Sequence, residues 1–158
     1  ISQGFMPEPR EDRQHGTHDG LDIYAAIGTP ILAAATGIVL KSYHEPFYGH
    51  HIVIDHGRDE DNRVICSRYL HLDSRTVKKG TRVERGQQIG TLGRTGLMAL
   101  FPHLHYEILI GPTPHRLKAH DPHKFWVDGI GVVTCFDKTR QFTDSPLQTT
   151  YPVLCRDK

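Results

Sequence analysis

Two histidines in the segment FPHLHYEI (101–108), His103 and His105, are spaced so that both could serve one chemical site. The segment is typical of a β-strand, in which residues i and i+2 point to the same side. Both imidazoles would then project from one face. Imidazole is an ordinary metal ligand and a proton acceptor near neutral pH. Three possibilities follow: both rings bind one metal ion, one ring binds the metal while the other has a different role, or neither takes part in chemistry.

A second candidate lies in the segment HGTHDGLDIY (15–24), where His18 precedes Asp22 by four residues with Gly20 between them. Histidine nitrogen and aspartate oxygen both bind zinc, and a glycine allows the backbone turn that would bring them to one ion. The spacing alone is weak, because a surface turn with a His–Asp hydrogen bond would give the same pattern. His15 competes with His18 for the role. Only the fold can bring this segment to the histidine pair far downstream.

A third fragment is RYLHLD (68–73), in which Tyr69 and His71 alternate with Leu70 and Leu72. Strand alternation predicts that Tyr69 and His71 face one side and that the leucines face the core. A lone histidine in such a strand is more often structural. A functional role for His71 is nevertheless more plausible here, because it is the third histidine found in a strand-like segment of this chain.

The elements that must position these residues are short β-like runs punctuated by glycine, proline, aspartate and asparagine. Glycine recurs so often that long helices are disfavoured. We therefore expect a mainly β fold: a single small domain built on an antiparallel β-sheet. The strand candidates are LDIYAA (21–26), PILAAATGIVLKSY (30–43), HHIVIDH (50–56), RVICSRYLHL (63–72), TRVERGQQIGTLG (81–93) and LHYEILI (104–110).

Length and charge narrow the classes of function. The 158 residues suffice for one domain with a real core, and twelve of them are histidines. The net charge of +1 gives no electrostatic case for a nucleic acid or an anionic membrane as partner. No run of 18 apolar residues exists, so we expect no membrane span. The chain shows no signal-peptide pattern and begins with Ile1, which we interpret as a processed or trimmed piece that leaves room for a removed targeting segment.

The composition changes near Pro112. Residues 112–124 are rich in proline, histidine and lysine, and we expect a loop that runs into a short turn. Beyond it, the segments GVVTCF (131–136) and YPVLC (151–155) are short strand candidates in a C-terminal appendage.

The three cysteines are Cys66, Cys135 and Cys155. Cys135 and Cys155 could form a disulfide that closes a loop in the tail, which would suit an oxidising compartment. Three free, mostly buried thiols are the alternative, and we favour the disulfide.

Together these segments resemble the M23 or LytM-type zinc metallopeptidases, which cut peptide cross-links in bacterial cell walls. The resemblance is carried, in order, by HDGLDIYAAIGTPILAAATGIV, GHHIVIDHG, RYLHL, GTRVERGQQIGTLGRTG and PHLHYEI. It implies a small antiparallel β-sheet with an open groove whose floor carries the metal. The domain would span residues 14–128, with a lead-in at 1–13 and a C-terminal extension at 129–158 packed on it.

The resemblance also implies roles for individual residues. His18, Asp22 and His105 would bind one zinc ion, while His71 and His103 would act on the reacting water and carbonyl. This division agrees with the chemistry, because a catalytic zinc keeps three protein ligands and leaves one position for water. We assign the general-base role to His103 and oxyanion stabilisation to His71, although the two roles could be exchanged or shared.

Glu107 lies two residues after His105 and would share its strand face. It could hydrogen-bond a ligand histidine, but an ordinary charged strand residue is the favoured interpretation.

Three functions compete. The first is a zinc endopeptidase acting on peptidoglycan peptides, extracytoplasmic (periplasmic or secreted) in a bacterium and expected to be a monomer. The second is a catalytically silent LytM-like domain that binds or activates a cell-wall amidase; silent members lose metal ligands, which this chain keeps. The third is a metal-binding or carrier β domain without enzymatic function. This interpretation gives no role to His71, which is not one of the expected metal ligands. The sequence does not distinguish between cleavage of a diaminopimelate cross-link and cleavage of an oligoglycine bridge.

Overall fold

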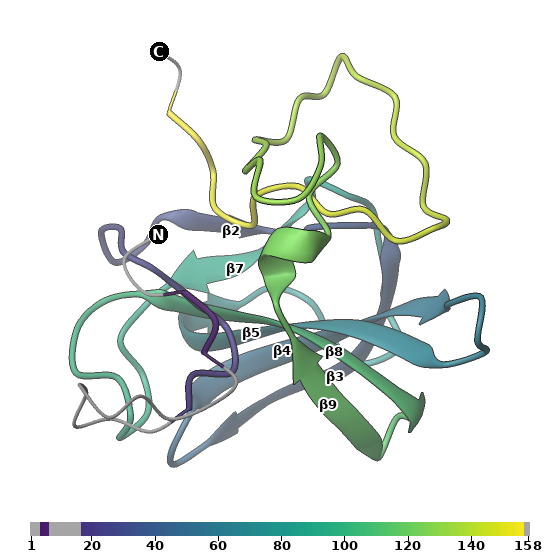
Figure 1. Ribbon diagram of the computed structural model, residues 1–158. Helices are drawn as coiled ribbons and strands as arrows, with labels where there is room; N and C mark the ends of the chain where they lie inside the picture. Colours follow the sequence, from purple (N-terminus) through teal and green to yellow (C-terminus); the bar gives the residue numbers. More distant parts are fainter. Residues whose placement is uncertain (1–3, 7–16, 157–158) are drawn as a thin grey trace.

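The computed structural model describes residues 4–6 and 17–156, and its regular structure is almost entirely antiparallel β-sheet (Figure 1). Within these ranges the single helical element is the short 3-10 helix η1, and no helix is long and apolar enough to cross a bilayer. The elements in chain order are β1 (Leu21–Ile23), β2 (Pro30–Leu32), β3 (Gly37–Glu45), β4 (Gly49–Arg58), β5 (Val64–Arg75), β6 (Arg82–Val83), β7 (Gln88–Leu92), β8 (Leu104–Thr113), β9 (Arg116–His120) and η1 (Pro122–Lys124).

The strands form one sheet in the order β1-β8-β5-β4-β3-β6, so the first strand pairs with the eighth. β9 pairs with β8, and β7 pairs with both β2 and β5. Figure 1 shows the long strands crossing the lower part of the view, with β2 and β7 above them. The prediction of a mainly antiparallel β fold is confirmed.

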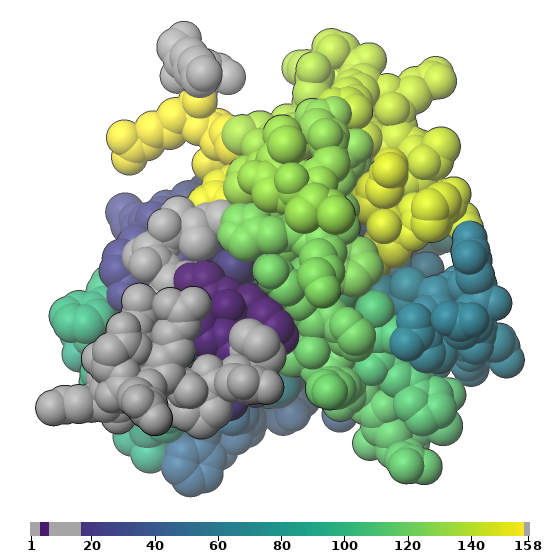
Figure 2. Space-filling view, viewed as in Figure 1, coloured from purple at the N-terminus to yellow at the C-terminus, as the bar shows by residue number. Residues whose placement is uncertain are grey.

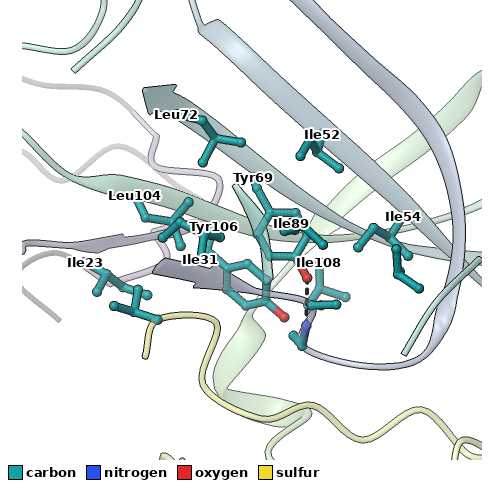
Figure 3. Packing of buried hydrophobic residues seen from close by; sticks show 14 of the residues in the cluster. Ile23, Ile31, Ile52, Ile54, Tyr69, Leu72, Ile89, Leu104, Tyr106 and Ile108 are labelled. Atoms are coloured by element: carbon teal, nitrogen blue, oxygen red, sulfur yellow. Dashed lines mark hydrogen bonds between the residues drawn. The ribbon is translucent and has the colours of Figure 1, made fainter. Parts of the chain in front are cut away.

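One face of the sheet packs the main hydrophobic core. Tyr69 and Tyr106 lie at its centre, fully buried, with ring centroids 5.4 Å apart (Figure 3). The Tyr69 hydroxyl accepts a hydrogen bond from the backbone N–H of Ala34 at 2.9 Å, so its one polar atom is satisfied inside the core. The core side of β5 and β8 is therefore fixed by two aromatic residues.

Tyr69 contradicts the expectation that it would share a face with His71. Tyr69 and Leu72 both pack in the main core. His71 leaves the strand alternation, because its φ of +64° lies in the left-handed region and a register shift follows in the pairing of β5 with β7. The irregularity turns the His71 side chain to the other side of the sheet from Tyr69.

The opposite face of the sheet is only partly covered. A small cluster of Val53, Val64, Cys66 and Leu109 lies there. Because residues two apart share a face, His105 lies on the same side as Leu109, away from the aromatic core. The chemistry-bearing residues of β8 therefore lie on the less covered face.

The segment after β8 differs from the expectation of a loop. Residues 116–120 form β9, whose register pairs Ala119 with Leu109 and Arg116 with Thr113 in the outer half of β8. The proposed tail strands are wrong: within the described part of the tail, only isolated bridges occur, such as Val153 with Ile31 and Thr149 with Trp126. Pro152, inside the second candidate, has no backbone N–H to contribute to a continuous strand ladder.

The tail closes one side of the main core. Trp126 and Val153 are buried in that core, and the backbone of Thr150 donates to the Ala34 carbonyl. Figure 2 shows this green-to-yellow chain lying over the upper part of the molecule. The disulfide between Cys135 and Cys155 is present, as favoured from the sequence.

Candidate metal centre

The pairing of β1 with β8 brings the two halves of the candidate site together. Asp22 lies directly opposite His105 in the register. His18 precedes β1 and is held by a backbone bridge to Met6, while its Nδ1 donates to the Gly4 carbonyl at 2.7 Å. A nitrogen facing a carbonyl must carry the hydrogen, so Nε2 of neutral His18 is left with its lone pair toward Asp22.

Gly20 is required for this close approach of β1 to β8. A Cβ at position 20 would lie 2.3 Å from the backbone oxygen of Tyr106 and 3.0 Å from Cγ of Glu107. The first contact is with backbone, which cannot move without disturbing β8.

We expect Gly20→Ala to lower the free energy of unfolding by about 1–3 kcal/mol and to weaken metal binding, because it pushes His18 and Asp22 away from β8. Thermal melting and zinc titration measure the two effects. Gly4→Ala is the matched control, since a Cβ there meets nothing within 4 Å. Equal behaviour of the two variants would contradict the packing argument.

The three predicted ligands converge around one carboxylate oxygen. Oδ1 of Asp22 lies 3.1 Å from Nε2 of His18 and 2.8 Å from Nδ1 of His105. The three ligand atoms all lie within 4.8 Å of one another, and among the described residues this is the single group of three or more potential ligands with that property. A tetrahedral zinc with bonds of roughly 2.0–2.1 Å holds its ligands roughly 3.3 Å apart, so the donor set fits such an ion.

Glu107 supports His105 from the other side. Nε2 of His105 lies 2.9 Å from Oε1 of Glu107, which is buried. The favoured interpretation of Glu107 as an ordinary charged residue was therefore wrong. A ring whose Nδ1 faces the ligand group and whose Nε2 donates to a carboxylate has the orientation expected of a metal ligand with a supporting hydrogen bond.

The protonation preferences of the site favour a cation at its centre. Burial opposes ionisation of Asp22, yet hydrogen bonds from His105 and from His18, each in its protonated form, lower the pKa of that carboxyl. Burial likewise opposes protonation of His105, but hydrogen bonds with Asp22 and Glu107 raise its pKa to about 9. Two carboxylates thus surround one imidazole, an arrangement that stabilises positive charge.

His71 and His103 lie beside the ligand group without joining it. Their ring centroids are 4.8 Å apart, and Nε2 of His103 lies 3.6 Å from Oδ1 of Asp22. Nδ1 of His103 donates to the Phe101 carbonyl at 2.7 Å, and Nδ1 of His71 donates to the Thr95 carbonyl at 2.9 Å. Because a carbonyl only accepts, both neutral rings carry their hydrogen on Nδ1 and leave the Nε2 lone pair available.

Burial also lowers the pKa of His71 to about 4, which favours its neutral form. The strained backbone of His71 is consistent with a functional position, since such conformations persist only where the surroundings enforce them. Its N–H donates to the Tyr48 carbonyl at 3.0 Å, which helps to hold the irregular turn.

Two loops form an apolar wall beside the histidines. The backbone N–H groups of Leu97 and Met98 donate to the carbonyls of Pro46 and Phe47, so the β3–β4 and β7–β8 loops lie side by side. Tyr24 packs edge-on against His103 at 5.8 Å. Exposed large apolar side chains in this region are Tyr24, Phe47, Tyr48, Leu97, Met98, Leu100 and Phe101.

The structure thus brings together the five residues singled out from the sequence: His18, Asp22, His71, His103 and His105. His15, the competing ligand, lies outside the described residues.

Comparison with known proteins identifies relatives over most of this region. The family model described as peptidase family M23 matches residues 16–117. Peptidoglycan DD-endopeptidase ShyA of Vibrio cholerae serotype O1 is 41% identical over 125 residues, which cover 77% of this chain and 28% of ShyA. The chain therefore spans little more than a quarter of that relative.

Two solved structures resemble the fold. A zinc containing peptidase from Vibrio cholerae aligns with a TM-score of 0.63 and 35% identity, over 75% of this chain and 35% of that one. The catalytic domain of lysostaphin from Staphylococcus simulans aligns with a TM-score of 0.60 and 30% identity, over 76% of this chain and 86% of that domain.

Proposed function

Because the chain belongs to peptidase family M23, we propose that it is a zinc-dependent endopeptidase that hydrolyses peptide cross-links of bacterial peptidoglycan. One observation carries the proposal: three converging donor residues, His18, Asp22 and His105, lie beside a pair of further histidines outside that group. The names of the relatives support the class of substrate, since ShyA is a peptidoglycan DD-endopeptidase. The structural neighbour described as a zinc containing peptidase supports the choice of metal.

The residues of the chain divide the work of peptide hydrolysis. A bound zinc ion would supply polarisation of the scissile carbonyl and a lower pKa for the attacking water. Nε2 of His103 accepts the proton of that water, because its Nδ1 is committed to the Phe101 carbonyl. The same nitrogen then delivers the proton to the leaving amine.

His71 takes a role that differs from the oxyanion stabilisation assigned from the sequence. Donation to an oxyanion needs a hydrogen on Nε2, and the neutral ring held by the Thr95 carbonyl has none there. We therefore assign His71 to accept a hydrogen bond from the water and orient it toward the carbonyl. His71 and His103 share the handling of the water.

The silent-domain alternative receives no support from this geometry. A domain that only binds an amidase has no need for two oriented histidines beside the metal ligands. The Cys135–Cys155 disulfide suits the oxidising conditions outside the cytoplasm, where the proposed substrate lies.

Digestion of purified cross-linked muropeptides tests the proposal. Zinc-loaded protein should convert dimers to monomers, chelation should abolish the conversion, and added zinc should restore it. Chromatography of the muropeptides measures the products. If the protein holds one zinc per chain and no cross-linked muropeptide is cleaved, the silent-domain reading replaces the proposal.

A further inference from the structure

A basic hollow lies on the same sheet face as the metal centre. The term denotes a cavity of about 320 Å³ whose lysine, arginine and histidine lining residues are Lys41, His51, Arg68 and His115. None of the described residues that line it is an aspartate or a glutamate. The hollow therefore concentrates positive charge beside the candidate site.

The register of β5 with β8 places the basic hollow next to the metal ligands. Arg68 lies opposite Glu107, and Leu70 lies opposite His105. Along an antiparallel strand two residues span roughly 7 Å, and alternate residues share a face. A peptide lying over the metal centre would reach the hollow within one or two residues of the scissile bond.

Two buried polar atoms at the basic hollow lack partners among the described residues. They are Nε of Arg68 and Nδ1 of His51. His51 is only 3% exposed. Nε of Arg68 always carries a hydrogen, so this buried donor without an acceptor has a desolvation cost, whereas neutral His51 carries only one ring hydrogen and its Nδ1 can be donor or acceptor.

The existing contacts of Arg68 leave it able to bind an anion. Its Nη1 lies 3.4 Å from Oε2 of Glu107, and its guanidinium lies over the Tyr48 ring at 5.1 Å from the centroid. Glu107 is already hydrogen-bonded to His105. The planar guanidinium is thus held in place while its Nε lacks a described partner.

The other basic side chain of the hollow, Lys41, also favours binding of an anion. Lys41 makes no ion pair with any described residue. Burial, followed by the charges of Arg68 and Lys41, lowers the pKa of His51 to about 3. A bound anion would offset this positive potential and offer an acceptor to the Arg68 guanidinium.

We propose that the basic hollow binds a free carboxylate of the substrate peptide near the scissile bond and so selects acidic cross-links over oligoglycine bridges. The inference rests on the proposed endopeptidase function. A diaminopimelate cross-link carries a carboxylate on the carbon that bears the leaving amine, and the stem peptide carries a second at its C-terminus. An oligoglycine bridge carries none beside its internal bonds.

Three synthetic cross-linked peptides test the inference: the free acid, one amidated at the diaminopimelate carboxyl next to the scissile bond, and one amidated at the C-terminal carboxyl. We expect the free acid to have a kcat/KM roughly tenfold to a hundredfold above one of the amides, which identifies the carboxylate bound. Arg68→Gln should remove this preference with zinc content unchanged. Lys41→Gln, which does not touch Glu107, should reduce the preference up to about fivefold.

Arg63→Gln is the matched control, because its guanidinium pairs with Asp59 away from the hollow; it should keep the preference. Equal cleavage of all three peptides would overturn the carboxylate subsite and leave the endopeptidase function standing. If no peptide is cleaved, the proposed function fails, and titration calorimetry with the uncleaved peptides decides the subsite. Tighter binding of the free acid, lost in Arg68→Gln, supports the inference, and equal binding overturns it.

Discussion

Asp22→Ala should lower zinc affinity and muropeptide turnover together, each by more than about a hundredfold. Supporting hydrogen bonds to metal ligands are already worth roughly tenfold to a hundredfold in affinity, and Asp22 is a ligand itself. Its Oδ1 is the atom on which His18 and His105 converge. Without it, two imidazoles remain and no anionic donor balances the ion. Elemental analysis measures the bound zinc, and chromatography of digested muropeptide dimers measures the turnover.

Asp19→Ala is the matched control for this substitution. Asp19 lies on the same segment but is exposed, so its replacement should leave zinc content and turnover unchanged. A thermal melt of each variant separates loss of metal from loss of fold. If Asp22→Ala retained zinc and cleaved dimers at the rate of Asp19→Ala, both the ligand assignment and the enzyme reading would be wrong.

The parts of the fold that the sequence predicts are those governed by local alternation. The strand ranges around His105 follow from the i, i+2 pattern, and the pair of His103 and His105 does lie at one site. Gly20 was expected to let the backbone turn. The structure adds that β8 packs against it too closely for a side chain.

The other features of the fold and the site depend on pairing between strands far apart in the sequence, which no local sequence pattern predicts. The pairing of Asp22 with His105 joins the first strand to the eighth. His71 departs from alternation because its backbone adopts a positive φ, which nothing in RYLHLD signals. The same departure explains why Tyr69, expected beside His71, packs in the core instead.

Two supporting residues depend on the same long-range pairing. The sequence gives the spacing of Glu107 to His105, but the burial of Glu107, which makes the hydrogen bond to His105 strong, depends on how β5 and β8 pair. No motif in the sequence marks Arg68 as part of the site. Only the register that sets it opposite Glu107 places its charge beside the metal centre.

His103→Ala separates proton transfer from metal binding, and it should lower kcat by roughly a hundredfold to ten-thousandfold while zinc content stays at the level of the unaltered protein. Nε2 of His103 lies 3.6 Å from Asp22, close enough to reach a water at the site, but His103 is not among the three converging ligands. Removal of a proton acceptor acts on the chemical step rather than on substrate binding, so KM should change little.

His120→Gln serves as the control for loss of an imidazole, because His120 lies on β9, outside the histidine cluster, and should leave kcat and zinc unchanged. The decisive comparison is the ratio of activity to bound zinc in His103→Ala. A ratio that falls with the activity means that His103 moves the proton. A ratio that stays constant, with zinc and activity lost in proportion, means that His103 binds the metal. The assignment of His105 as a ligand and His103 as the proton acceptor would then be wrong.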